Sequence, residues 1–235
     1  LHILSAEDEE KCVLPRIYHE QKVDGFIILG QLDRRYIEVL REAGIAFVCL
    51  DFYTDQTDAD SIITDNFYGM YEMTNYLINQ GHTDLVFVGN IYATSSIQDR
   101  FLGFYKSLLE HRISLREEYV IDDRDEKGKF LDIRLPDKLP TAFVCNCDQI
   151  AYELINKLQR EGIKVPDDVS VTGFDNDIYA TIISPRITTV EVDMPAMAGS
   201  AAQTIMQKIK NPSFHTGRVL IKGQIIHRDS VKSLH

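Results

Sequence analysis

The chain has 235 residues, of which 44% are hydrophobic and 26% charged, a composition that excludes a disordered or membrane-embedded protein. Its 25 Lys and Arg against 36 Asp and Glu give a net charge of -11, so this piece should repel nucleic-acid phosphates rather than bind them. The four scattered cysteines form no disulfide framework, which favours a cytoplasmic protein with reduced thiols. No apolar run approaches the roughly 18 to 20 residues that cross a bilayer, so we expect no membrane segment.

Strand-length apolar stretches alternate with helix-length amphipathic stretches from the start of the chain, which is typical of parallel sheets with helical crossovers. In a first lobe we expect strands at 1–4, 23–30 and 45–51, and helices near 8–21 and 33–43. A loop rich in Asp and Thr at 53–60 then leads to an extended stretch at 61–65. We place the first lobe boundary near Thr64.

The same alternation continues in a second lobe. We expect helices at 67–79, near 98–111 and at 149–160, the first and last of them closed by Gly81 and Gly162. Strands are expected at 84–89, 119–121, 141–145 and 169–173, with a shortened helix at 131–139. Apolar residues at helical spacing over 198–209 predict a last helix. The fold class is therefore α/β, with two doubly wound parallel-sheet lobes.

Signatures of catalysis and of bound cofactors are absent from the sequence. None of the 13 glycines forms a Gly-x-Gly, and there is no phosphate-binding loop or nucleophile elbow. The seven histidines are isolated and show none of the spacings of a zinc site. We therefore expect no enzyme, no cofactor and no metal.

Eight segments, in order along the whole chain, resemble the effector-binding domain of the lactose/galactose repressor family. They are VDGFII at 23–28, DNFYG at 65–69, GH at 81–82, RFLGF at 100–104, PTAFVCNCDQIA at 140–151, VPDDVSVTGFDN at 165–176, PRITTV at 185–190 and RDS at 228–230. The segment at 165–176 is the closest match. Because the matches keep the family's order, they are more specific than any single motif.

This resemblance implies a periplasmic-binding-protein-like fold with two lobes that are joined by three crossovers. The first lobe comprises residues 1–64 and 193–222, and the second comprises residues 65–192 and 223–235. It implies a small effector, a sugar or related polyol, bound between the lobes, and a signal passed to a helix-turn-helix that binds operator DNA. We expect that helix-turn-helix, and the family's first strand and helix, to lie outside this chain. The function so implied is the ligand-sensing domain of a transcriptional repressor.

By the resemblance, Arg100, Asp175 and Asp51 lie where the family contacts its ligand. A guanidinium that donates in a fixed fork and a carboxylate that accepts are suited to sugar hydroxyls. Each residue has a plainer alternative. An arginine at a helix start is usually solvated, Asp175 suits a helix N-cap, and Asp51 suits a turn.

Further effector-binding positions follow from the same match. They are Phe52, Ser96, Cys147 and Met194. Cys147 replaces a common Asn, which removes one amide that would read a hydroxyl. The stretch 122–125 stands where relatives often place an aromatic over the ligand. Its aspartates predict an acidic rim, which favours a polar effector, either cationic or poor in phosphate, over a phosphorylated one.

The family also implies a homodimer, because its operators are read as paired half-sites. The candidate interface consists of Tyr152, Tyr179, Ile182 and Ile183. The stretch 178–183 holds more apolar side chains than one buried face needs, and Tyr152 lies in the helix that matches the family's neighbouring interface element. The alternative is that they pack beneath the ligand site.

Two other functions stay open at this point. The first is an extracytoplasmic sugar-binding protein of a transporter, which shares the fold, and the second is an enzyme built on the same fold. The coding sequence upstream would separate the first from a repressor, because it would encode a signal peptide rather than a helix-turn-helix. A turnover screen would test the second.

Overall fold

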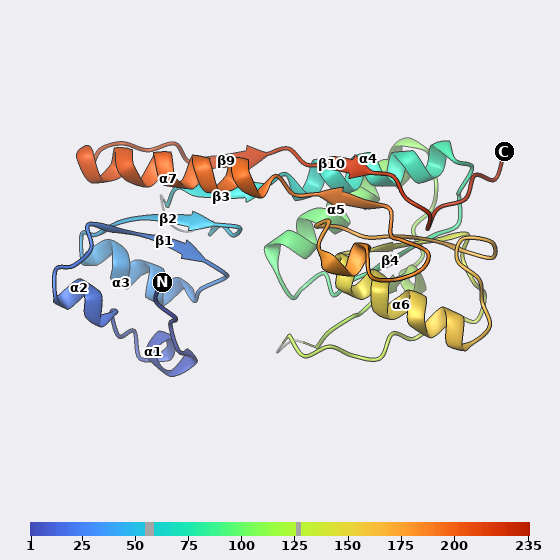
Figure 1. Cartoon of the computed structure of the whole chain (residues 1–235), viewed down its shortest axis with the longest axis horizontal. Coiled ribbons are helices and arrows are strands. Elements are labelled where there is room, and N and C mark those ends of the chain that lie inside the picture. The colour runs from blue at the N-terminus through green and yellow to red at the C-terminus, as the bar shows by residue number, and fades with distance from the viewer. Residues whose placement is uncertain (55–58, 126–127) are drawn as a thin grey trace. The chain divides into compact units, whose positions relative to one another are not determined.

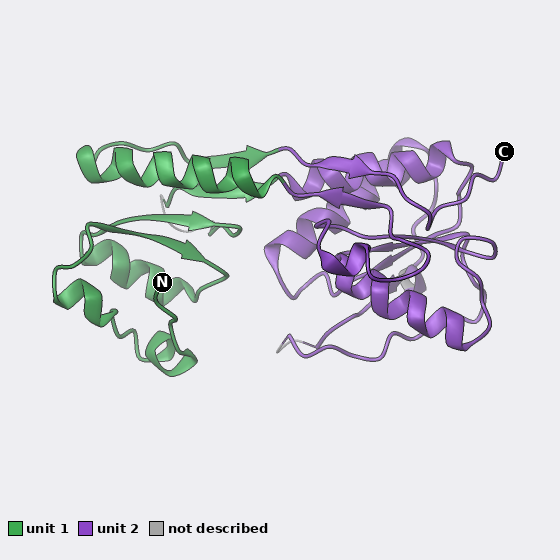
Figure 2. Ribbon diagram, in the orientation of Figure 1, with its two compact units in different colours: residues 1–64, 193–221 green, residues 65–192, 222–235 purple. Residues whose placement is uncertain are grey.

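The computed structural model describes residues 1–54, 59–125 and 128–235, and the chain divides into two compact units (Figure 2). Unit 1 comprises residues 1–64 and 193–221, and unit 2 comprises residues 65–192 and 222–235. The chain therefore passes from one unit to the other three times. Lys222, assigned to the first lobe from the sequence, belongs to unit 2, where its Nζ lies 3.4 Å from the carboxylate of Glu72.

Unit 1 is built on a parallel sheet of order β1-β2-β3-β9 (Figure 1). Its strands are β1 (Gly25–Leu29), β2 (Ala46–Leu50), β3 (Ser61–Thr64) and β9 (Arg218–Ile221). Helix α7 (Met194–Lys210) packs against the first three strands, and α3 (Arg34–Glu42) buries Tyr36, Ile37 and Leu40. Strand β9 was not predicted, since only four residues at alternating exposure form it.

Two predictions for the start of unit 1 are wrong. Residues 1–4 form no strand, and they pair with no other described strand. The helix expected at 8–21 is broken into α1 (Ala6–Glu10) and α2 (Arg16–His19). Pro15 explains the break, because proline disfavours helical backbone in the residue before it and has no N–H to donate. Of the predicted loop at 53–60, residues 55–58 lie outside the described chain.

Unit 2 contains a second parallel sheet, of order β5-β4-β6-β7. Its strands are β4 (Leu85–Val88), β5 (Val120–Ile121), β6 (Ala142–Cys145) and β7 (Ser170–Thr172). Every residue of β4 and β6 is buried, which is why both strands read as continuous apolar runs. A separate antiparallel pair joins β8 (Thr189–Glu191) to β10 (Gln224–Ile226). Neither of these two short strands was predicted.

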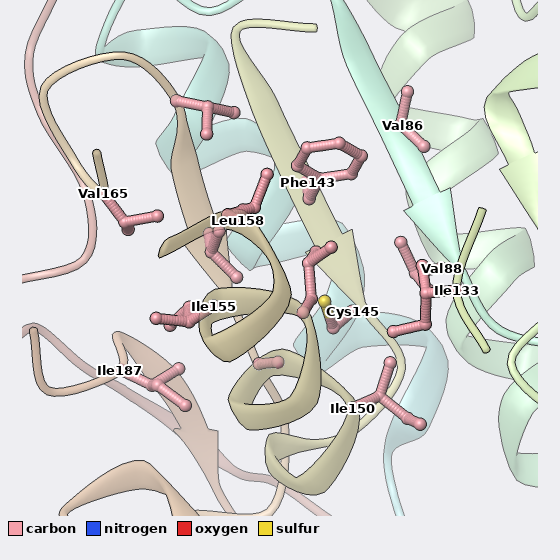
Figure 3. Packing of buried hydrophobic residues seen from close by; sticks show 14 of the residues in the cluster. Val86, Val88, Ile133, Phe143, Cys145, Ile150, Ile155, Leu158, Val165 and Ile187 are labelled. Carbon is pink, nitrogen blue, oxygen red and sulfur yellow. The ribbon is translucent and has the colours of Figure 1, made fainter. Parts of the chain in front are cut away.

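Three α-helices lie along the sheet of unit 2. They are α4 (Asn66–Asn79), α5 (Ser95–Glu110) and α6 (Asp148–Arg160), with short 3-10 helices η1 (Glu117–Tyr119) and η2 (Ile178–Ala180). Figure 3 shows Ile150, Ile155 and Leu158 of α6 in the cluster that also holds Phe143 and Cys145 of β6. Burying each such aliphatic side chain contributes roughly 1.5 to 3 kcal/mol.

Helix boundaries in unit 2 differ from the predictions at two places. Helix α5 begins three residues early because Thr94 caps it, its Oγ1 accepting the amide of Ile97. No helix forms at 131–139, where Pro136 interrupts the segment and the buried Ile133 fixes it against the core. No helix in the described part of the chain is long and apolar enough to span a bilayer.

Candidate functional site

The carboxyl ends of the four parallel strands bring polar residues to one edge of the sheet in unit 2. Open parallel sheets bind their ligands outside this edge. The residues that follow these strands are Asn90 after β4, Asp122, Asp123 and Arg124 after β5, Asn146, Cys147 and Asp148 after β6, and Asp175 after β7. We take this edge, together with Arg100 of α5, as the candidate site.

Arg100 is the centre of the site. Its Nε donates to Oδ1 of Asn66 at 2.8 Å, its Nη1 to the carbonyl of Asn146 at 2.6 Å, and its Nη2 to Oδ1 of Asp175 at 3.0 Å. The guanidinium carbon lies 3.8 Å from the ring centroid of Phe174. Arg100 is only 7% exposed, which rules out the plain solvated arginine at a helix start. Its fork is thus fixed in place before any ligand arrives.

Asp175 is held in backbone geometry that side-chain-bearing residues rarely adopt. Its φ is +108° and that of the following Asn176 is +56°. Such strain persists where the surroundings enforce it, often at functional sites. Here the Asp175 amide donates to the carbonyl of Val190 at 2.8 Å, and Asn176 links Arg228 to Glu191 through its side chain. The N-cap of η2 is Asp177, so the alternative role of Asp175 as helix cap does not hold.

A second arginine, Arg124, follows β5 and lies beside the fully buried carboxylate of Asp123. Asp123 is 0% exposed and accepts from the amide of Asn90 at 2.8 Å, from Nδ2 of Asn146 at 3.0 Å, and from Nε and Nη2 of Arg124 at 2.9 and 2.7 Å. The Arg124 guanidinium also lies 4.8 Å from the Phe130 ring centroid. The prediction of an acidic rim at 122–125 is therefore wrong for Asp123, because this carboxylate faces inward and its charge is paired with the Arg124 guanidinium.

Two groups at the start of α6 have pKa values raised well above their ordinary ones. Burial and the nearby Asp175 carboxylate raise the pKa of the Cys147 thiol to about 11. Burial also raises the pKa of Asp148 to about 7, although its carboxyl accepts the Thr189 hydroxyl at 2.6 Å and the Asp177 amide at 3.0 Å. Cys147 occupies the N-cap position without capping the helix by its side chain.

The other predicted effector residues are distributed over both units. Ser96 lies in the first turn of α5 rather than in a loop, and its hydroxyl is 3.0 Å from that of Thr94. Asp51, Phe52 and Met194 belong to unit 1. Asp51 follows β2 with a φ of +67° and is exposed, while Met194 begins α7 and is 64% exposed. Phe52 is 3% exposed in the core of unit 1, so it offers a ligand almost no surface.

The predicted interface residues lie on α6, where Tyr152 stands, and on and just after η2, which packs against α6. The rings of Tyr152 and Tyr179 pack with centroids 5.2 Å apart, and Ile182 is 56% exposed. Ile183 and Tyr152 both pack against the hydrophobic core of unit 2, which supports the alternative reading for these two residues.

Sequence reasoning missed several residues of the candidate site. They are Asn66, Asn146, Asp123, Arg124 and Phe174. Asn66, Asn146 and Phe174 stand inside matched segments. Asn146 and Phe174 also adjoin Cys147 and Asp175, which were assigned a role, and this adjacency was the available signal. For Asp123 nothing local distinguishes a buried aspartate from its exposed neighbour Asp122.

Residues 74–231 match a family model described as a periplasmic binding protein-like domain. The chain is 31% identical over 227 residues to the HTH-type transcriptional repressor PurR of Vibrio campbellii, a match that covers 94% of this chain and 68% of that protein. It is 27% identical over 225 residues to the ribose operon repressor of Haemophilus influenzae, again covering 94% and 68%.

Among solved structures, a LacI family transcriptional regulator from Enterococcus faecium with bound ribose superposes with a TM-score of 0.82 at 22% identity. The match covers 100% of this chain and 88% of that one. At this identity the likeness establishes a shared fold.

Proposed function

We propose that this chain senses a small sugar or polyol. The chain belongs to the LacI family of transcription regulators and forms the periplasmic-binding-protein-like effector domain of such a regulator. Its relatives are repressors, which argues against a transporter's binding protein. A regulator that binds its effector and releases it unchanged needs no catalytic group, so we propose binding without turnover.

The observation that carries the proposal is the ion pair between the buried Arg100 and the partly exposed Asp175 at the strand ends of unit 2. Contacts with described residues use three of the five N–H groups of the Arg100 guanidinium, and the Asp175 side chain remains 34% exposed. An arginine that donates and a carboxylate that accepts are the groups that read a ring of hydroxyls. A relative named a ribose operon repressor and a neighbour with bound ribose support the same class of ligand.

A thermal-shift screen of ribose, glucose, galactose, polyols and nucleosides tests the proposal. An effector at a hundred times its Kd stabilises the native state by about 2.7 kcal/mol, which raises the melting temperature by several degrees. Arg100→Ala should abolish that rise, and Arg100→Lys, which keeps the charge but not the fork, should reduce it. Arg134→Ala, at an exposed position of the same unit, is the matched control. Equal stabilisation of Arg100→Ala and the unchanged chain, or no response to the whole panel, would overturn the proposal.

DNA binding belongs to another part of the protein in this proposal, because this chain is acidic and has a net charge of -11. We also propose a homodimer that uses Tyr152, Tyr179 and Ile182, with Ile178, which is 67% exposed, added to the surface. Sedimentation at micromolar concentration should give a dimer, and Ile178→Lys with Ile182→Lys should give a monomer. A chain that sediments as a monomer before substitution contradicts this part of the proposal.

A further inference from the structure

The backbone of Asp175 is hydrogen-bonded through both its amide and its carbonyl to the segment that leads from unit 2 into unit 1. The amide donates to the carbonyl of Val190 at 2.8 Å, and the carbonyl accepts from the amide of Val192 at 3.4 Å. These two bonds make an isolated parallel bridge between Asp175 and Glu191. Val192 is the residue at which the chain passes into unit 1. The geometry of the effector carboxylate therefore depends on this connecting segment.

The carboxylate of Glu191 joins three segments of unit 2 at this point. Its Oε1 accepts from Nδ2 of Asn176 at 2.8 Å, and its Oε2 accepts from Nε2 of Gln224 at 2.6 Å. Asn176 follows Asp175, whose φ of +108° persists only because the surrounding structure enforces it. Gln224 is the first residue of β10, where the chain has just returned from unit 1. One carboxylate thus links the strained turn at 175–176 to both connecting strands, β8 and β10.

The register of β8 and β10 brings the Glu191 and Gln224 side chains together. The two strands pair antiparallel with Gln224 directly opposite Glu191, and side chains of opposite residues lie on the same face of such a pair. The strands also approach each other closely. A Cβ at Gly223 would lie 2.6 Å from the carbonyl oxygen of Glu191 and 2.9 Å from Cγ1 of Val190, so glycine is needed there. The contact of Glu191 with Gln224 therefore depends on the pairing of the two connecting strands.

We infer that Glu191 is a positioning residue for the effector-binding Asp175. Its carboxylate holds the turn at 175–176 against the paired strands β8 and β10, so effector affinity depends on that pairing. By thermodynamic linkage the dependence is reciprocal, and a bound effector stabilises the β8–β10 pair. The inference rests on the function proposed above and adds to it a connection from the ligand to both strands that lead to unit 1.

Calorimetric titration with the sugar that gives the largest shift in the thermal panel tests this inference. Glu191→Ala removes both contacts of the carboxylate. Glu191→Gln keeps an oxygen that accepts from Asn176 and an amide that donates to Gln224, once the Gln224 amide is turned so that its oxygen faces β8. Glu72→Ala is the matched control, because it removes a carboxylate that contacts the same connection through Lys222, at 3.4 Å, rather than through the turn at 175–176.

Glu191→Ala should bind the sugar about tenfold more weakly than the unchanged chain, which is the loss expected for a hydrogen bond to a charged group. Glu191→Gln and Glu72→Ala should bind it within about twofold of the unchanged chain. Equal affinity of Glu191→Ala and the unchanged chain, equal losses in Glu191→Ala and Glu72→Ala, or a Glu191→Gln variant as weak as Glu191→Ala overturns the inference while leaving the Arg100 result standing.

Amide hydrogen exchange of the sugar-free chain, measured by NMR, tests the positioning role without any ligand. The amides of Asp175 and Val192, which form the bridge, should exchange faster in Glu191→Ala than in the unchanged chain or in Glu72→Ala. Gln224→Ala, at an exposed position, breaks only the link to β10 and should change exchange in the same direction, so the test survives if Glu191→Ala does not fold. Unchanged exchange at both amides overturns the inference. A panel in which no sugar binds overturns the proposed function instead, and the exchange result then decides the positioning role alone.

Discussion

The carboxyl of Asp148 should make the stability of unit 2 fall as the pH rises through neutrality. Gly173 approaches it so closely that a Cβ there would lie 2.1 Å from its Oδ1, and this close backbone packing keeps water away. Burial raises its pKa to about 7, well above the ordinary value of 3.8. The folded state therefore holds a proton that the unfolded chain has already released, and stability is lost as the pH rises toward 7.

The size of the effect follows from the pKa difference. Stability falls by about 1.4 kcal/mol per pH unit while only the folded state is protonated, so raising the pH from 5 to 8 should remove about 2 to 3 kcal/mol, given a folded pKa of about 7. Asp148→Asn keeps the shape and cannot ionise. The loss should therefore be absent from the variant and present in the unchanged chain.

Urea denaturation at pH 5 and pH 8, followed by circular dichroism, measures this difference. Asp137→Asn, at an exposed position in the same unit, is the control and should follow the unchanged chain. Other titrating groups contribute equally to all three proteins and cancel in the comparison. If Asp148→Asn and the unchanged chain lost the same stability between the two pH values, the reasoning from burial would be refuted.

Further predictions concern packing and buried charge. Gly103→Ala should prevent the close approach of α4 and α5, because its Cβ would lie 2.1 Å from the carbonyl oxygen of Phe67, and we expect a loss of several kcal/mol in urea denaturation. Gly199→Ala, in open space within α7, should instead stabilise by up to about 1 kcal/mol, and a loss there would contradict the argument. Asp60→Asn should cost roughly 3 to 5 kcal/mol in the same assay, because the fully buried carboxylate binds Lys208 and two backbone amides. A cost below 1 kcal/mol would show that this pair is not needed.

The alternation of strands and helices was predictable because buried parallel strands are continuous apolar runs, as β4 and β6 are. The wrong or missing predictions concern segments whose secondary structure depends on pairing with a neighbouring strand or on a single residue. Residues 1–4 have the composition of a strand, yet a strand exists only through a hydrogen-bonded neighbour. Strands β8, β9 and β10 are too short to give a periodic signal. Pro15 was the one local signal that should have divided the first predicted helix.

At the candidate site, Arg100 and Asp175 were predictable from segments that match a known family. Their actual contacts were not, because Asn66, Asn146 and Phe174 come from three separate segments that meet only in the folded unit. The sequence presents Asp122 and Asp123 as equivalent acidic residues, but only the second is buried. Its burial removes one carboxylate from the expected acidic rim, so that the exposed Asp122 and the partly exposed Arg124 follow β5 side by side in sequence.

Amide hydrogen exchange, with and without the stabilising sugar, tests most directly whether the strand ends of unit 2 bind the effector. The account predicts slower exchange on sugar addition in residues 89–91, 122–125, 146–148 and 174–176, with little change at the opposite ends of the same strands. These segments meet only at the carboxyl edge of the sheet, so their joint protection would identify that edge. Slower exchange confined to α6 and η2, or no change in any of the four segments at a saturating sugar concentration, would contradict the central claim.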